Sequence, residues 1–191
     1  GLLAPHYIPY NSRIGSGAGV PIYWAVQPNM DLVFTPNFTY KQGFLLDVQW
    51  AHRLESGSYF VRAQGIRQFH PDNFYWSPVG PGYKPFRGAV STAGEFDINE
   101  KWKFGWDGTL LSDRFFFSDY ARANPLVPNP YSRETSSTAY LTGKSERSWF
   151  DLRGYYFQGL SPRDYQKQLP VALPLLEYNR TFPLAPSKFA G

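Results

Sequence analysis

Six segments of the chain alternate apolar and polar residues at a period of two, and most of the apolar positions hold large or aromatic side chains. The clearest segment is 31–41, where Leu32, Phe34 and Phe38 fall on one face and Thr35 and Asn37 fall on the other. This period is typical of a β-strand with one apolar and one polar face. Segments of about ten residues with this pattern, joined by turns, indicate an outer-membrane β-barrel.

The composition agrees with strands and turns rather than helices. Aromatic residues make up 19% of the 191 residues, and the chain holds 17 Gly and 17 Pro. No run of 18 apolar residues is present, so no transmembrane helix is expected. The absence of Cys excludes disulfides and thiolate chemistry. The net charge of +4 comes from scattered basic residues, which favours a solvated surface over a nucleic-acid partner.

The alternation of short turns and long loops predicts an all-β, antiparallel up-and-down meander that forms part of a transmembrane barrel. Residues 1–19 are expected to be a lead-in or junction segment with a flexible glycine stretch, and 20–191 a partial barrel domain of about nine strands. The start of the chain shows no signal sequence, so we expect a mature protein or an internal fragment. The nine expected strands are 20–27, 31–41, 44–53, 58–69, 88–98, 101–111, 137–143, 148–157 and 175–184.

No group of residues predicts catalysis, a metal site or a cofactor. The three histidines are far apart in the sequence and match no metal-binding spacing. Glu95 and Asp97 share a face, as a hydrolase pair would, but the nearby Lys101 and Lys103 favour a solvated polar face instead. We therefore expect a protein that is not an enzyme.

The two faces of the strands predict which side chains meet water and which meet lipid. The polar face is expected to line a hydrated lumen through Asp47, Arg62, Gln64, Glu95, Lys101, Lys103, Asp151 and Arg153, with Gln49 and Asp107 beside them. The outward face is expected to hold Phe34, Phe38, Phe44, Leu46, Val48, Phe104, Trp106, Phe150 and Leu152. Two alternatives stay open: a generic outer-membrane porin, and a soluble aromatic-rich β-sandwich that binds carbohydrate through stacked Trp and Tyr.

Two prolines lie inside the first two expected strands. If Gln27 and Met30 flank a two-residue turn, Pro21 lies directly opposite Pro36. Because proline lacks the backbone donor of the ladder, each would forfeit a hydrogen bond worth about 1 kcal/mol. In this register Ile22, Trp24 and Val26 would share the lumen side. The pair predicts a weak level in the first hairpin, and the alternative is an edge strand blunted against aggregation.

The same region resembles the start of the barrel in the lipopolysaccharide-assembly outer-membrane protein family LptD, also called the organic-solvent-tolerance family. The resemblance lies in the order Pro21-Ile22-Tyr23-Trp24-Ala25-Val26-Gln27-Pro28-Asn29-Met30-Asp31, followed by Thr35-Pro36 and Gln42-Gly43. Gln42 stands where the family usually has Arg. The start at Gly1-Leu2-Leu3-Ala4-Pro5 is similar to the family's junction between a periplasmic jelly roll and the barrel.

The resemblance implies a large barrel whose first and last strands meet at a lateral gate, of which this chain is a part. The gate would involve Pro21, Pro36, Ile22 and Trp24. Lipopolysaccharide would pass through it into the outer leaflet of a Gram-negative outer membrane. The implied partners are lipopolysaccharide, the plug lipoprotein LptE, the periplasmic bridge proteins of the same pathway and outer-membrane lipid.

Overall fold

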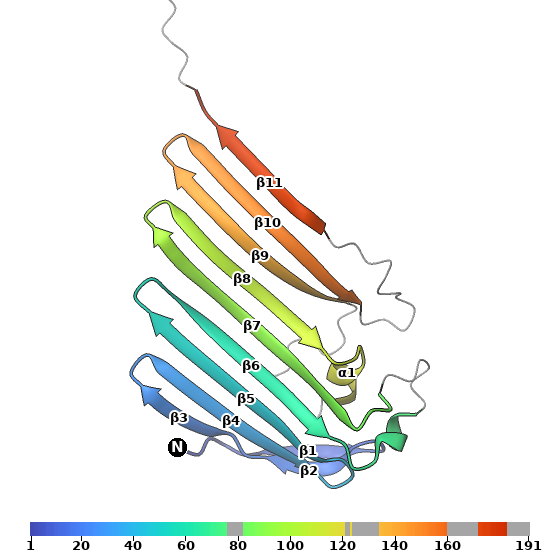
Figure 1. The fold of residues 1–191 in the computed structure, drawn as a ribbon. Coiled ribbons are helices and arrows are strands. Elements are labelled where there is room, and N and C mark those ends of the chain that lie inside the picture. The colour runs from blue at the N-terminus through green and yellow to red at the C-terminus, as the bar shows by residue number, and fades with distance from the viewer. Residues whose placement is uncertain (76–81, 121–122, 124–133, 160–171, 183–191) are drawn as a thin grey trace, which may run out of the picture.

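The computed structural model describes residues 1–75, 82–120, 123, 134–159 and 172–182, which form one curved antiparallel sheet (Figure 1). The strands are β1 (His6–Asn11), β2 (Gly15–Gly19), β3 (Ile22–Gln27), β4 (Met30–Thr39), β5 (Gly43–Leu54), β6 (Gly57–Arg67), β7 (Phe86–Asn99), β8 (Trp102–Leu111), β9 (Glu134–Ser145), β10 (Ser148–Gly159) and β11 (Ala172–Arg180). A 3-10 turn, η1 (Pro71–Phe74), and a short helix, α1 (Phe116–Tyr120), lie in the long loops. Among these residues no helix has the length and apolar character needed to cross a membrane.

The order of the strands in the sheet confirms the predicted all-β meander. Each strand from β4 to β11 pairs antiparallel with its neighbours in sequence, and all nine expected strands are present. β2 and β3 lie one after the other along the same edge of β4 (Figure 1). The last strand ends at Arg180, and the end of the segment expected to be strand, 183–184, lies outside the described residues.

The glycine stretch at 15–19 is a strand, so the expectation of a flexible linker there was wrong. β2 is paired on both sides, with β1 and with β4. A Cβ atom on Gly17 would lie 1.8 Å from the carbonyl oxygen of Phe38, and one on Gly19 would lie 2.2 Å from Asn37 Oδ1. Glycine is needed here because the neighbouring backbone and side chains approach too closely for any other residue.

The register of the ladders separates polar from apolar side chains. Directly paired residues point to the same side of a sheet, and side chains alternate along each strand. The pairs Thr35↔Asp47↔Gln64 and Gln49↔Arg62↔Ser91 therefore define a polar face, and Phe34↔Val48 and Phe96↔Phe104 define an apolar face. The residues expected on the polar side lie on the polar face, except Lys101, which lies in the turn between β7 and β8.

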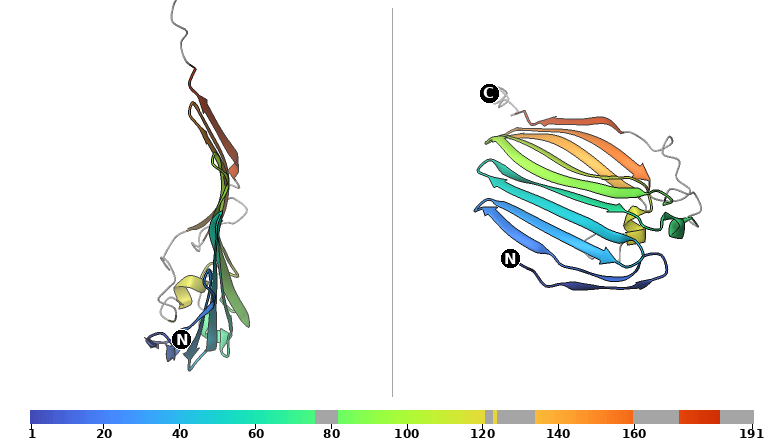
Figure 2. Two further views of the ribbon diagram at one scale, coloured as in Figure 1. Left: turned by 90° about the vertical axis from the view of Figure 1, so that its left-hand side faces the viewer. Right: turned by 60° about the horizontal axis from the view of Figure 1, so that its bottom comes forward.

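The buried core lies on the polar face, at the end of the sheet where the long loops are. It contains Leu45, Ile66, Ala89 and Leu111 from the strands and Phe74, Phe116, Phe117, Tyr120, Ile8 and Ile14 from the loops and the first hairpin. α1 and the β1–β2 hairpin lie on the same side of the sheet (Figure 2). The apolar face is uncovered in the described part of the chain, with Phe44 54% and Leu110 58% exposed.

Candidate lumen face and strand seam

The first charged group on the polar face is centred on the buried carboxylate of Asp47 in β5. The guanidinium of Arg62 in β6 donates from Nε to Asp47 Oδ1 at 2.9 Å, and the amide of Gln64 donates to Asp47 Oδ2 at 3.1 Å. The side chains of Asp47 and Arg62 are only 5% and 11% exposed. This ion pair is largely removed from water, and the Asp47 carboxylate accepts hydrogen bonds from both Arg62 and Gln64. These three predicted lumen residues therefore link β5 to β6 rather than present a free charge to the lumen.

The second charged group lies nearer the short turns and faces water. Lys103 in β8 donates to Glu95 at 3.1 Å and lies 3.2 Å from Asp97, and all three side chains are about half exposed. The hydroxyl of Tyr140 in β9 donates to the other oxygen of Glu95 at 2.7 Å. A Cβ on Gly105 would lie 2.3 Å from the ring of Tyr140, so this glycine gives the ring room to lie across β8.

The third group joins the second through the same tyrosine ring. Arg153 donates from Nε to Asp151 Oδ1 at 2.8 Å within β10, and its guanidinium lies 5.4 Å from the centroid of the Tyr140 ring. The predicted residues Glu95, Lys103, Asp151 and Arg153 therefore form one polar band across β7–β10. Tyr140 connects them, and its alternation with Thr138 and Thr142 was the only sequence sign that it would face this side.

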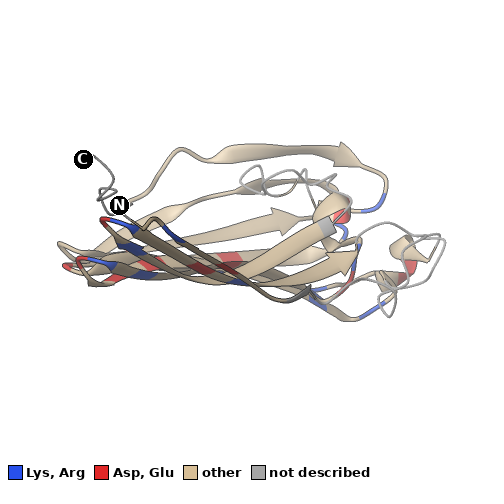
Figure 3. Cartoon of the chain, turned by 90° about the horizontal axis from the view of Figure 1, so that it is seen from above, with Lys and Arg blue, Asp and Glu red and all other residues tan. Residues whose placement is uncertain are grey.

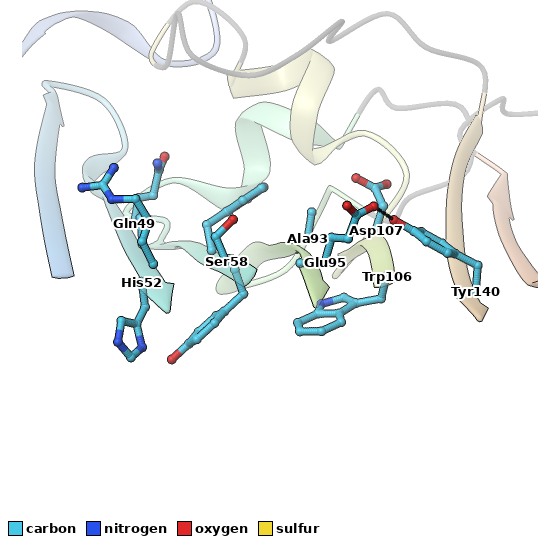
Figure 4. Close-up of a pocket in the computed structure, with 13 residues that line it drawn as sticks. Gln49, His52, Ser58, Ala93, Glu95, Trp106, Asp107 and Tyr140 are labelled. Atoms are coloured by element: carbon cyan, nitrogen blue, oxygen red, sulfur yellow. Dashed lines mark hydrogen bonds between the residues drawn. The ribbon is translucent and has the colours of Figure 1, made fainter. Parts of the chain in front are cut away.

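A hollow of about 570 Å³ lies on the polar face beside this band. Its lining includes Gln49, Arg53, Glu95, Asp107 and Tyr140. Figure 4 shows Gln49, Glu95 and Asp107 projecting from one side of the sheet, and His52 and Trp106 from the other. Acidic and basic positions lie close together along these strands (Figure 3). Such a surface can hold water and exchange hydrogen bonds with hydroxyl and phosphate groups.

A fourth ionic group was not predicted from the sequence and is buried against η1 and α1. The guanidinium of Arg87 in β7 donates to Asp113 at 2.7 Å and 2.8 Å, and to Asp119 of α1 at 2.8 Å. Its side chain is 0% exposed, and the rings of Phe74, Phe116 and Tyr120 lie 4.9–5.9 Å from it. The sequence sign was an aspartate on each side of the aromatic run 115–117.

The same group reaches the first hairpin. Arg13, in the turn between β1 and β2, donates to the second oxygen of Asp119 at 2.8 Å. Burial raises the pKa of the Asp119 carboxyl, and the charges of Arg87 and Arg13 offset this only in part. Burial also raises the pKa of Tyr120, whose hydroxyl donates to Gln68 Oε1 at 2.6 Å. These contacts join α1 to the start of β7, to Gln68 after β6 and to the β1–β2 hairpin.

The predicted pairing of Pro21 with Pro36 is wrong. A bulge between Ala25 and Gln27 shifts the ladder by one residue, so that Ile22 pairs with Phe34 and Trp24 with Leu32. Val20, not Pro21, stands opposite Pro36 and donates its N–H to the Pro36 carbonyl at 3.3 Å. The two-residue turn at Pro28-Asn29 is as assumed, since Gln27 pairs with Met30, and the extra residue is Val26 in β3, which the spacing alone did not reveal.

The two prolines remove hydrogen bonds from different ladders. In an antiparallel strand, backbone groups alternate between the two neighbouring strands. Pro36 receives the N–H of Val20, so its own missing donor would have faced Val20. Pro21 receives the N–H of Leu3 at 2.9 Å, so its missing donor faces the N-terminal segment. The two missing hydrogen bonds therefore lie in different places, one between Pro36 of β4 and Val20, and one between Pro21 and the N-terminal segment.

The shift also moves the expected gate side chains. Ile22 and Trp24 share the apolar face with their partners Phe34 and Leu32, and not the lumen side as the unshifted register implied. The Trp24 side chain is 61% exposed.

No group of three His, Asp or Glu in the described parts of the chain is arranged to bind a metal ion.

Comparison with known proteins gives the family. A family model described as LptD, LPS transport system D, matches residues 85–190. Proteins named LPS-assembly protein LptD are similar over most of this chain: that of Hahella chejuensis is 25% identical over 143 residues (75% of this chain, 17% of the relative), and that of Mannheimia succiniciproducens 24% over 179 residues (94% and 21%). The Yersinia enterocolitica protein of the same name is 23% identical over 149 residues (78% and 18%). The chain spans about a fifth of the length of these relatives. The match and the fold together show that this chain belongs to the LptD family.

Proposed function

We propose that this chain forms part of the wall of a β-barrel in the outer membrane of a Gram-negative bacterium. We also propose that the barrel inserts lipopolysaccharide into the outer leaflet through a lateral gate at β3. The relatives named above carry LPS assembly in their names. The role is transport of an amphipathic glycolipid rather than catalysis.

The observation that carries this proposal is the uncovered apolar face. Phe44, Leu46, Val90 and Leu110 are 43–58% exposed, while the ion-paired residues Asp47, Arg62, Glu95 and Lys103 and the buried core lie on the opposite side. No second sheet covers the apolar face in the described residues, as a carbohydrate-binding sandwich would require. Lipid hydrocarbon is the environment in which such a face is stable. Family membership favours the gated translocon over a generic porin with the same topology.

The polar band and hollow support passage of the sugar and phosphate groups of the cargo. Buried ion pairs such as Arg62–Asp47 make the wall rigid, and the half-exposed Lys103–Glu95 pair keeps the lumen surface hydrated. The expected partners are lipopolysaccharide, the plug lipoprotein LptE, the periplasmic bridge proteins and outer-membrane lipid.

The environment of the apolar face can be tested first. The parent protein should stay monodisperse only in detergent or lipid, and photoreactive residues at Phe44 and Leu46 should be captured by lipid acyl chains. The same probes at Asp47 and Gln49, on the opposite face of the same strand, should not be captured. Equal capture at both sets of positions would contradict the assignment of the faces.

The gate can be tested with single proline replacements in the parent protein. Pro36→Thr supplies an N–H that can bond to Val20 and should stabilise the β3–β4 side of the seam by about 1 kcal/mol. If opening near β3 limits transport, lipopolysaccharide should arrive at the surface more slowly while barrel assembly stays normal. Normal arrival with more aggregation of the unfolded chain would instead support the alternative that the proline only limits aggregation, before β4 is paired on both sides.

A further inference from the structure

A groove of about 490 Å³ lies on the apolar face over β5, β6 and β7, which are neighbours in the sheet (Figure 1), at the end with the long loops. Its walls are apolar side chains that are 43–65% exposed: Phe44, Leu46, Phe69 and Phe86. Its floor is Gly65, where an added Cβ would meet only the Arg87 carbonyl oxygen, at 4.0 Å. The groove is therefore open to the outside and has room for an apolar chain.

Arg67, the last residue of β6, brings a positive charge to this groove. In β4–β8, all of whose residues the structure describes, it is the only Asp, Glu, Lys or Arg that the register places on the apolar face. Its partner across the ladder is Phe86, and its guanidinium lies 5.7 Å from the centroid of that ring. None of the ion pairs between described residues includes Arg67, so its N–H donors stay available to a ligand.

The position of Arg67 along β6 suits the boundary between the hydrocarbon core and the lipid headgroups. On the lipid face of a barrel a charged residue is unfavourable at the bilayer midplane and tolerated near the interfaces, where aromatic side chains gather. Arg67 lies at the end of its strand, among the aromatic walls of the groove. The next residues on the same face of β6 are Gly65, Ala63 and Val61, which are small or apolar. A charged end thus leads into an apolar track along the strand.

We propose that this groove binds one lipopolysaccharide molecule of the outer leaflet, with an acyl chain along β6 and a phosphate bound by Arg67. The planar guanidinium can donate two hydrogen bonds to one phosphate while its face stays against Phe86. The longer loops of outer-membrane barrels are extracellular, so this end of β6 lies in the outer leaflet. The proposal rests on the proposed function, and it adds a binding site on the outer wall, separate from the route of the cargo through the lumen.

A second groove on the same face gives a matched comparison. It has a volume of about 460 Å³, and its lining includes Val90, Leu110, Gly154 and Tyr156. No Lys or Arg of the described chain lines it. It offers an acyl chain a similar apolar environment without a positive charge, so it should not prefer a phosphorylated lipid.

The test uses the full-length parent in phosphatidylcholine nanodiscs that contain a small fraction of purified lipopolysaccharide. A photoreactive residue replaces Phe44 in the proposed site or Leu110 in the second groove, and lipopolysaccharide adducts are quantified after illumination. The adduct at Phe44 should fall about tenfold in Arg67→Gln, because charge-assisted hydrogen bonds are lost, and Arg67→Lys should keep most of it. The adduct at Leu110 should be the same in all three proteins. Heat-modifiable gel mobility shows that each barrel is assembled.

The contact between Arg67 and phosphate can also be removed from the side of the ligand. Lipopolysaccharide without its phosphates should label the Phe44 position as weakly in the wild type as the intact ligand does in Arg67→Gln. Combining the two changes should give no further loss, because both remove the same contact. An equal amount of phosphatidylglycerol should displace lipopolysaccharide only weakly, since a phosphate monoester carries more charge than the diester of a phospholipid.

The apolar part of the site is tested by filling each groove. Gly65→Leu places a side chain on the floor of the proposed site, where a Cβ has room, and should lower the adduct at Phe44. Gly154→Leu, also at an open glycine, fills the second groove and should lower the adduct at Leu110 alone.

Three results would overturn the site while leaving the lipid-facing wall in place. These are an adduct at Phe44 that is unchanged in Arg67→Gln, one that is unchanged in Gly65→Leu, and one that phosphatidylglycerol displaces as well as added lipopolysaccharide does. If neither Phe44 nor Leu110 captures any lipid, the apolar face does not meet the bilayer, and the proposed function fails together with the site.

Discussion

Arg87 and Lys103 belong to the paired strands β7 and β8, point to the same polar face and each contact two carboxylates. Arg87 lies at the end with the long loops, where its side chain is 0% exposed among three aromatic rings. Lys103 lies near the short turns, where it is 51% exposed. The two ends of one sheet thus use the same kind of ion pair in opposite environments.

This difference shows that burial, and not the number of partners, determines how much a charged side chain contributes to stability. In water the attraction of Lys103 to Glu95 and Asp97 is nearly balanced by solvation and side-chain entropy. Away from water, Asp113 and Asp119 can stay ionised only while Arg87 is present. The long-loop end is therefore expected to be rigid and sensitive to mutation, and the short-turn end tolerant and hydrated.

The largest expected effect comes from Arg87→Met. It keeps an apolar chain between the rings but leaves two buried carboxylates without their main partner, which should lower the free energy of unfolding by about 3–5 kcal/mol. Thermal unfolding of the parent protein in detergent measures this loss. Arg87→Met combined with Asp113→Asn and Asp119→Asn should recover part of it. A loss below about 1 kcal/mol would mean that water reaches this group.

The next effect compares a crowded glycine with an open one. Gly17→Ala places a Cβ 1.8 Å from the Phe38 carbonyl, so β2 must move away from β4, at a cost of about 1–3 kcal/mol. Gly154 in β10 has no atom within 4 Å of a built Cβ, so Gly154→Ala should be neutral or slightly stabilising. The same thermal measurement on both variants decides the comparison. Equal effects would show that β2 is as loosely held as the open part of β10.

A smaller effect is expected from Tyr120→Phe. The change keeps the ring against Arg87 and removes only the hydrogen bond to Gln68 Oε1, so it should cost about 1–1.5 kcal/mol. Tyr156→Phe, on a ring that is 40% exposed, serves as the control and should cost less. Equal losses would indicate that the buried hydroxyl gains nothing from its partner.

The dependence on pH tests the carboxyl of Asp119 beside Arg87, Arg13 and Asp113. Because its pKa in the folded protein is raised, its contribution to stability is fully present below the ordinary value of 3.8 and is lost as pH rises through the raised pKa. The unfolding midpoint of the wild type minus that of Asp119→Asn should therefore fall as pH rises from about 3.8. A difference that grows with pH would show that the two arginines outweigh burial.

The smallest expected effect is that of Lys103→Met. Its ammonium group is exposed and its partners are solvated, so the thermal midpoint should not change measurably at physiological salt. A clear loss of stability would break the comparison between the two ends of the sheet. It would mean that the polar band across β7–β10 is less hydrated than its exposure indicates.

The sequence was a good guide to the strands and their faces but a poor guide to the loops. Alternation at a period of two located all nine strands from β3 to β11, because these strands have one mainly apolar face and one mainly polar face. The same rule placed Asp47, Glu95 and Arg153 on one face. It could not place Arg87, because its partners Asp113 and Asp119 come from a loop whose path follows no period.

The register of the β3–β4 hairpin shows a second limit of prediction from the sequence. The count from Gln27 and Met30 placed Pro21 opposite Pro36, and one bulged residue near Val26 shifted the pairing and moved Ile22 and Trp24 to the apolar face. A bulge depends on how strands twist against their neighbours, and single residues do not encode it. The sequence also predicted a flexible linker at 15–19. This stretch is a strand because β1 and β4 pack closely on both sides of it, and those contacts come from residues elsewhere in the chain.

The sequence by itself determined an all-β meander, the side of the sheet for the residues assigned to a face in β4–β8 and β10, and the family that the chain resembles. These follow from local alternation and from the order of residues along the chain. The tertiary structure alone decided that Arg87 joins α1 to the sheet and that Tyr140 links the polar band. Each of these depends on contacts between residues far apart in the sequence, where packing space and desolvation select the partner.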